Sequence, residues 1–228
     1  MSQTTIVTGL AVRELWISFR LLLLLAAYVG AGAAAALLPA SLSATLVRLA
    51  VGVSMAMVAG AAVAAWSLSR DRLLGRAGWL ATRSVPRGTI LAGWFVALAA
   101  VSGLGLIAVG LLGWLAVATP VSRLDPVAFA ATCGAIGCSS LALLALGLLL
   151  GTLLRPPAAA MGAAVASALI ISVAWLALPG IATPVEALMQ LPRLPVPISV
   201  AAQGSGASLA AAAVLVLVAH VALERVDL

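Results

Sequence analysis

The chain has 228 residues, of which 64% are hydrophobic and 8% are charged, and it carries a net charge of +6. Because so few polar side chains do not cover the surface of a water-soluble globule, this composition indicates an integral membrane protein. The basic balance does not indicate nucleic-acid binding, since that function needs basic residues on a water-facing surface beside stacking aromatic rings.

The first predicted element is a surface helix within residues 2–20, which leads into the first membrane span. Its mixture of apolar and charged residues is typical of a helix that lies along a membrane interface. The apolar positions are Ile6, Leu10, Val12, Leu15, Trp16 and Phe19, and the charged ones are Arg13, Glu14 and Arg20. A cleaved signal peptide is disfavoured, because the apolar run that follows is too long for one.

Charged residues divide the rest of the chain into six uncharged runs: 21–47, 49–69, 88–122, 126–154, 156–185 and 194–223. Each run exceeds the roughly 20 residues that a helix needs to cross a hydrocarbon core of about 30 Å. We therefore predict one all-α transmembrane domain over residues 1–228. Its expected spans are 21–40, 46–69, 89–118, 127–154, 158–178 and 207–223.

The longest polar interruption lies between the second and third predicted spans, in residues 70–94. It holds five of the twelve arginines: Arg70, Arg72, Arg76, Arg83 and Arg87. At about 100° per residue, Arg72, Arg76, Trp79 and Arg83 share one face of a helix, while leucines and alanines take another. The pattern predicts a short amphipathic helix that ends before Pro86, because proline disfavours a helical residue before it.

Proline interrupts the apolar sequence before the last span, from Leu178 to Ser208. This stretch contains Pro179, Pro184, Pro192, Pro195 and Pro197, followed by Gly204 and Gly206. It is too broken to span a membrane and too apolar for a free loop, so it is expected to enter the outer leaflet as short re-entrant helices.

The arginines also predict the orientation, because loops rich in Lys and Arg stay on the cytoplasmic side. With both termini inside, nine arginines are cytoplasmic and three are outside, namely Arg48, Arg123 and Arg193. We therefore expect a multi-pass protein of the cell inner membrane with both termini in the cytoplasm.

Glycines within the spans predict close helix packing. Gly147 and Gly151 form a GxxxG motif, which permits tight packing or dimerisation, and three further pairs add small faces. These pairs are Gly30/Gly32, Gly103/Gly105 and Gly110/Gly113.

The sulfur-containing residues do not predict a metal site. Cys133 and Cys138 are about 140° apart on a helix, with Cα atoms beyond about 7 Å, which excludes a disulfide or a chelate on one face. Met55 and Met57 also lie on different faces, so with Met161 they are expected to fill the core rather than bind copper.

Several catalytic motifs are absent from the sequence. The chain has no lysine, hence no GxxxxGK[ST] phosphate loop, and it has no HExxH metalloprotease motif or paired aspartates in a span. We predict that the chain is not an enzyme and binds no cofactor of its own.

Secondary transporters usually place ionisable groups near the middle of the bilayer. By the predicted spans, none of the six acidic residues lies there. His220 is the ionisable residue within a span, near the cytoplasmic end, where packing at the interface is favoured over a proton relay. A transporter without ionisable groups that couple it to protons or sodium needs energy from a partner.

The central loop carries an ordered series of residues: an acidic residue, a glycine four positions on, a leucine-rich turn, a Pro/Ser/Arg cluster and an Ile-Leu-x-Gly run. They are Asp71, Gly75, Leu80, Arg83, Pro86, Arg87, Ile90, Leu91 and Gly93. This series resembles the loop between the second and third spans of type-2 ATP-binding-cassette (ABC) exporter permeases. The head, Arg13 to Leu25, and the tail, Leu223 to Leu228, are similar to the family as well.

The chain departs from the family pattern at three positions. Asp71 replaces the usual glutamate, Pro86 stands about two positions late, and Trp94 occupies a place where the family often has lysine.

The resemblance implies a permease that forms a dimer with a second copy or a paralogue. Two separate ATP-binding-cassette ATPase subunits, which hold the ATP and Mg, would dock on the central loop. The expected docking residues are Asp71, Arg72, Gly75, Arg76, Trp79, Leu80, Arg83 and Arg87. The arginines would pair with carboxylates of the ATPase, and Trp79 or Leu80 would fill an apolar slot. The alternative is that these arginines only set topology and bind anionic lipid headgroups.

The family resemblance also implies that the re-entrant segment is an outer gate, which includes Pro192, Pro195 and Pro197. The scarcity of charge in the spans favours an amphiphilic cargo, such as a lipid, a hydrophobic peptide or a drug. Two further classes stay open: a non-transporting membrane anchor or assembly factor that recruits a soluble partner through the same loop, and a channel, which the lack of a polar ring disfavours.

Overall fold

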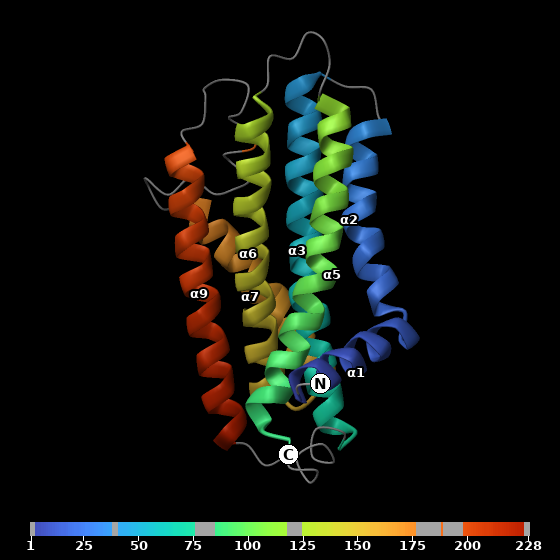
Figure 1. Ribbon diagram of the computed structural model, residues 1–228, viewed down its shortest axis with the longest axis vertical. Coiled ribbons are helices and arrows are strands. Elements are labelled where there is room, and N and C mark those ends of the chain that lie inside the picture. Colours follow the sequence, from blue (N-terminus) through green and yellow to red (C-terminus); the bar gives the residue numbers. More distant parts are fainter. Residues whose placement is uncertain are drawn as a thin grey trace.

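The computed structural model describes residues 3–37, 41–75, 85–117, 125–176, 188 and 198–225. Within these ranges the regular structure is entirely helical, which confirms the predicted all-α class. The helices are α1 (Gln3–Ile17), α2 (Arg20–Leu37), α3 (Leu42–Leu73), α5 (Arg87–Val117), α6 (Pro126–Leu153), α7 (Pro157–Leu176) and α9 (Ile198–Arg225). Figure 1 shows the long helices running along the long axis of the molecule, with α1 lying across its lower end.

Five of the described helices are long and apolar enough to cross a membrane. They are Arg20–Leu37, Leu42–Leu73, Arg87–Val117, Pro126–Leu153 and Ser205–Arg225. A sixth span was predicted where α7 (Pro157–Leu176) lies, but only its part Pro157–Ile171 counts as an apolar helix, and this part is shorter than the five spans. These helices indicate a membrane protein, and the sixth span stays a prediction.

Local sequence signals explain where two of the spanning helices begin. The carboxylate of Asp125 accepts hydrogen bonds from the backbone N–H groups of Val127 and Ala128, and Pro126 occupies the first turn of α6. The hydroxyl of Ser41 accepts a bond from the N–H of Ala44 at the start of α3. These side chains satisfy backbone donors that a helix N-terminus leaves without partners.

Helix α1 lies within residues 2–20, where a surface helix was predicted, and packs one side against the bundle. Its bundle-facing side consists of Val7, Ala11 and Leu15, which are all buried. Ile6 and Leu10 are exposed on the outward side. Helix α1 crosses close over α5 at Gly93, where a side chain would collide with Val7.

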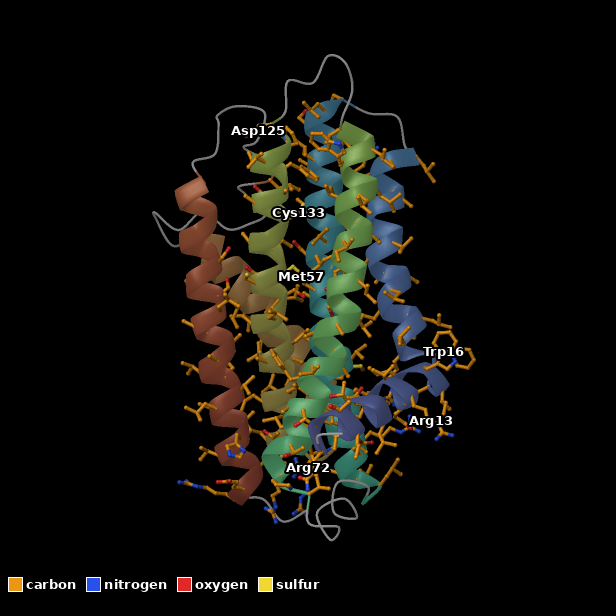
Figure 2. The ribbon with its side chains drawn as sticks, in the orientation of Figure 1. Arg13, Trp16, Met57, Arg72, Asp125 and Cys133 are labelled. Carbon is orange, nitrogen blue, oxygen red and sulfur yellow. The ribbon has the colours of Figure 1, made fainter. Side chains whose placement is uncertain are left out.

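The turn between α1 and α2 places large apolar side chains on the surface. Phe19 has a φ of 59°, the left-handed conformation that a non-glycine residue adopts at a cost of roughly 1–3 kcal/mol. Trp16, Ile17 and Phe19 are all more than half exposed there. Figure 2 shows Trp16 projecting from the side of the molecule, as expected for an aromatic anchor at a membrane interface.

The predicted re-entrant segment, Leu178 to Ser208, overlaps the start of α9. Residues 198–208 belong to this continuous helix. Leu188 is buried and lines a small cavity with Leu49 and Val53. The proposed gate residues Pro192, Pro195 and Pro197 lie outside the described residues.

The centre of the bundle is the contact between α3 and α6, which we call the α3–α6 seam and define by Ala61, Ala65, Gly147 and Gly151. A Cβ atom at Gly147 would collide with the carbonyl oxygen of Ala61, and one at Gly151 would lie 2.7 Å from that of Ala65. The GxxxG motif therefore brings two helix backbones together within one chain, which confirms the predicted close packing.

Candidate docking site at the arginine-rich end

Both α1 and the C-terminal ends of α3, α6 and α9 lie at one end of the bundle, the lower end in Figure 1. We call it the arginine-rich end, because most of the described arginines belong to segments that meet there: Arg13, Arg20, Arg70, Arg72, Arg87, Arg155 and Arg225. Among the described residues, Arg48 alone lies in the opposite half, near the start of α3. Figure 2 shows Arg13 and Arg72 at this end and Asp125 at the other.

The end of α3 is bonded to α5 through an acidic residue and an indole. The Nε1–H of Trp94 donates a 3.0 Å hydrogen bond to Oδ2 of Asp71, and Trp94 is 2% exposed. The carboxylate of Asp71 therefore helps to hold α3 against α5.

Arg72 connects α3 to the C-terminus of α6. Its guanidinium donates to the carbonyl oxygens of Gly151, at 3.1 Å, and of Thr152. Both carbonyls belong to the last turn of α6, where they have no N–H partner within the helix. A cation at this position is also stabilised by the negative end of the helix dipole.

Ser69 strengthens the same connection one turn earlier on α3. It is fully buried, and its hydroxyl lies 2.9 Å from the carbonyl oxygen of Leu154 and 2.7 Å from that of Arg155. Leu154 and Arg155 are the two residues that follow α6. The hydroxyl of Ser69 therefore holds the turn between α6 and α7 against α3.

Arg87 makes the corresponding connection between α5 and α9. It is the first residue of α5, and its guanidinium donates to the carbonyl oxygens of Leu223, at 3.1 Å, and Glu224, at 3.0 Å. These carbonyls lie in the last turn of α9, which ends at Arg225. The same physical rule applies as at α6, because a helix C-terminus offers unpaired acceptors and a negative partial charge.

We call Ser69, Arg72 and Arg87, with the helix-end carbonyls that they contact, the carbonyl clasp. Arg72, near the end of α3, and Arg87, at the start of α5, lie on either side of the loop that joins these two helices. Through them, the residues on either side of the loop hold α6 and α9 as well as α3 and α5. A displacement of the loop would therefore act on four helices.

The predicted docking residues divide into two groups. Arg76, Trp79, Leu80 and Arg83 lie outside the described residues. Asp71, Arg72 and Arg87 are described, and each has a hydrogen-bond partner within the chain. Gly75 is exposed with a φ of 70°, and its N–H donates to the carbonyl of Arg72. Glycine adopts this left-handed conformation without strain, which explains its place just after the end of α3.

Arg20, at the start of α2, is almost completely buried. Its guanidinium donates a 3.0 Å bond to the hydroxyl of Ser67 and lies 6.0 Å from the ring centroid of Trp66. A buried cation needs such partners, because an ion transferred from water without them is strongly destabilising. Arg20 therefore fastens the turn after α1 to α3.

His220 lies near the end of α9 and packs against α5. Its Nε2 lies 3.3 Å from Oε1 of Glu224, and its ring fills the space that a side chain at Gly88 would occupy. This placement agrees with the predicted packing role.

The described residues contain no cluster of three or more His, Cys, Asp or Glu side chains that could hold a metal ion. Cys133 and Cys138 are free thiols. Met55 is 62% exposed whereas Met57 is 8% exposed, so the two thioethers point in different directions, as their spacing predicted.

Sequence reasoning missed Ser69 and the role of Trp94. A serine near the end of an apolar helix carries no distinctive signal, because its acceptors are backbone carbonyls that every helix end presents. Trp94 had a partial signal, since an indole N–H in an apolar span needs an acceptor, and Asp71 is an acidic residue near the same end.

A scan of the sequence against protein-family models gives no match, and a search of the curated proteins gives none either. The resemblance to ABC exporter permeases therefore stays a prediction from the residues of the central loop and the two chain ends.

Proposed function

We propose that this chain is the transmembrane subunit of an ATP-driven exporter of the ABC type, energised by a separate ATPase that docks on the loop between α3 and α5. The observation that carries this proposal is the carbonyl clasp. Arg72 joins one end of the loop to α6, and Arg87 joins the other end to α9. A partner that moves this loop would move the ends of several spanning helices together.

The charge distribution supports an orientation with the arginine-rich end in the cytoplasm, since positively charged segments are retained there. The ATPase would then approach from the side where ATP is found. Closure of two ATPase subunits would pull on the docked loop, and the clasp would pass the displacement to α6 and α9. One chain would form half of the pathway, with a second copy or a paralogue as the other half.

The cargo that fits best is an amphiphile. The acidic residues that the structure describes, Glu14, Asp71, Asp125 and Glu224, lie at or near helix ends rather than midway along the spanning helices. A strongly ionic substrate would lack fixed partners in the membrane interior, where an unpaired charge is very unfavourable. A lipid, a hydrophobic peptide or a drug needs no such partner.

Affinity purification of the tagged chain in mild detergent tests this function. We expect a protein with a GxxxxGK[ST] motif to co-elute at one copy per permease chain and to hydrolyse ATP. Reproducible absence of any ATPase, from membranes in which a candidate is expressed, would reject the exporter and favour the membrane anchor.

Two loop variants test where the ATPase docks. Arg76→Glu and Trp79→Ala should each reduce the co-purified ATPase at least tenfold, because they remove a charge partner and an apolar anchor. Arg13→Glu is the matched control, since Arg13 is an exposed arginine of α1 at the same end. Equal losses in Arg76→Glu and Arg13→Glu would indicate a general charge effect on topology or lipid binding instead of docking.

A further inference from the structure

An apolar groove runs between α5 and α9, with α6 as its floor. It has a volume of about 650 Å³. Gly88, Leu91, Ala92 and Phe95 form the α5 wall at the spacing of a single helix face, and Leu141 contributes to the floor. We call it the α5–α9 groove.

The α9 wall of the groove extends from Leu209 to His220. At 1.5 Å per residue this stretch is about 16 Å long. One leaflet of a bilayer contributes half of a hydrocarbon core of about 30 Å, so the groove has the length of a lipid tail within one leaflet. Its end at Gly88 and His220 places it in the leaflet next to the arginine-rich end.

The groove opens toward hydrocarbon rather than water, because α5 and α9 are two of the membrane-spanning helices. Exposed Leu209, Ala213 and Leu217 form its α9 edge. Apart from His220 at one end, these walls offer water no side-chain hydrogen-bond partners, and an empty gap would lose dispersion contacts on both sides. The ligand that fits this groove is therefore a hydrocarbon chain.

Among the residues that the structure describes, the polar end of the groove carries a net positive charge. Arg87 precedes the groove residue Gly88, and its guanidinium contacts the last turn of α9, which also contains Arg225. The opposing charge in this turn is Glu224, which lies beside His220. Two arginines against one glutamate favour a negatively charged headgroup at this position.

We propose that the α5–α9 groove binds one acyl chain of an anionic phospholipid, with the phosphate beside Arg87 and Arg225. This lipid occupies the protein in the membrane whether or not an ATPase is bound. The inference depends on insertion of α5 and α9 into a bilayer, and it does not depend on the exporter function.

Photo-crosslinking tests the proposal with the full chain in vesicles. The probe is phosphatidylglycerol with a diazirine in its acyl chain, present as a minor component of phosphatidylcholine vesicles. We expect crosslinks to concentrate on residues 91–95 of α5 and 209–217 of α9. Labelling spread evenly over the outward faces of α2, α5 and α9 would show ordinary surrounding lipid and overturn the proposal.

Two tryptophan variants of α9 sharpen the test. Ala213→Trp fills the groove and should reduce crosslinking to α5 at least fivefold. Ala211→Trp is the matched control, because Ala211 is also exposed but lies on the opposite flank of α9, outside the groove. Equal labelling of α5 in both variants would contradict the site, and the map of the unmodified chain decides the question if Ala213→Trp does not fold.

A phosphatidylcholine probe with the same diazirine tests the charge requirement. Phosphatidylglycerol should label α5 and α9 several-fold more strongly, because the phosphatidylcholine headgroup carries a positive choline toward the arginines. Equal labelling by both probes would overturn the assignment of an anionic lipid. None of these readouts involves an ATPase, so their failure is distinct from failure of the exporter proposal.

Discussion

The α3–α6 seam and the α5–α9 groove differ in how closely the helices approach each other. At the seam, Gly147 and Gly151 place the backbone of α6 directly against Ala61 and Ala65 of α3. Between α5 and α9, by contrast, a space of about 650 Å³ separates the walls. One part of the bundle is closed by backbone contact, and the other is open along its length.

The difference between the seam and the groove shows that apolar composition alone does not bring two helices into close contact within a membrane. Lipid tails are as apolar as leucine, so helices associate there through close van der Waals packing rather than through the hydrophobic effect. Glycine and alanine provide such packing at the seam. Phe95 and Leu217, which line the groove, are too bulky for a similar approach. We infer that the seam holds the bundle together and that the groove accepts lipid.

The largest effect is expected for Gly147→Ala at the seam. The new methyl group would collide with the carbonyl oxygen of Ala61, and a backbone atom cannot turn aside as a side chain does. Overpacking of this kind destabilises by about 1–3 kcal/mol. Thermal unfolding in detergent, followed by loss of the monodisperse protein, measures the change.

Gly134→Ala is the matched control for this prediction. Gly134 is also a glycine of α6, and a Cβ there meets nothing within 4 Å. Because alanine is the better helix former, this variant should be neutral or more stable by up to about 1 kcal/mol. If Gly147→Ala were as stable as Gly134→Ala, the seam would not be the close contact that we describe.

The close packing at the seam could be predicted from sequence, whereas its partner helix could not. Spacing by four places Gly147 and Gly151 on one face of a helix, and two small residues on a face permit close approach. Alanine-rich stretches occur in most of the predicted spans, so the sequence does not indicate that Ala61 and Ala65 are the residues against which these glycines pack. The motif left dimerisation open, but the structure uses it between α3 and α6 of one chain.

Five of the six predicted spans, and the gathering of the described arginines at one end, could be predicted because both follow from the bilayer: long uncharged runs cross it, and positive charges stay at one side. The acceptors of Arg72 and Arg87 were not predictable. These are backbone carbonyls at the ends of α6 and α9, and every helix end offers the same groups whatever its sequence. The docking role of the loop arginines was predicted from the resemblance to exporter permeases, which does not indicate that Arg72 and Arg87 contact helix-end carbonyls within the chain.

A smaller effect is expected for Tyr28→Phe, beside the seam. Tyr28 is completely buried, and its hydroxyl lies 3.2 Å from that of Ser140 on α6. Hydrogen bonds between membrane helices contribute about 0.6 kcal/mol on average and up to about 1.7 kcal/mol. We expect a loss in this range by the same thermal measurement.

Ser54→Ala is the control for Tyr28→Phe. The hydroxyl of Ser54 donates to the carbonyl of Ala50 in its own helix, so its removal breaks no bond between helices. Its loss should lower stability less than Tyr28→Phe does. The opposite order would show that the contact between Tyr28 and Ser140 does not contribute to helix association.

The smallest effect is expected for Gly88→Ala, at the polar end of the α5–α9 groove. A methyl group there would lie 2.8 Å from Cε1 of His220, which is as close as several contacts at the seam. The neighbour, however, is the end of a side chain beside an open space, so the imidazole can move into the groove. Alanine also favours the helix slightly more than glycine does. The net change should stay within about 1 kcal/mol in either direction. A loss of stability equal to that of Gly147→Ala would mean that α5 and α9 are held as rigidly as α3 and α6. The imidazole of His220 could then not move aside for a lipid headgroup.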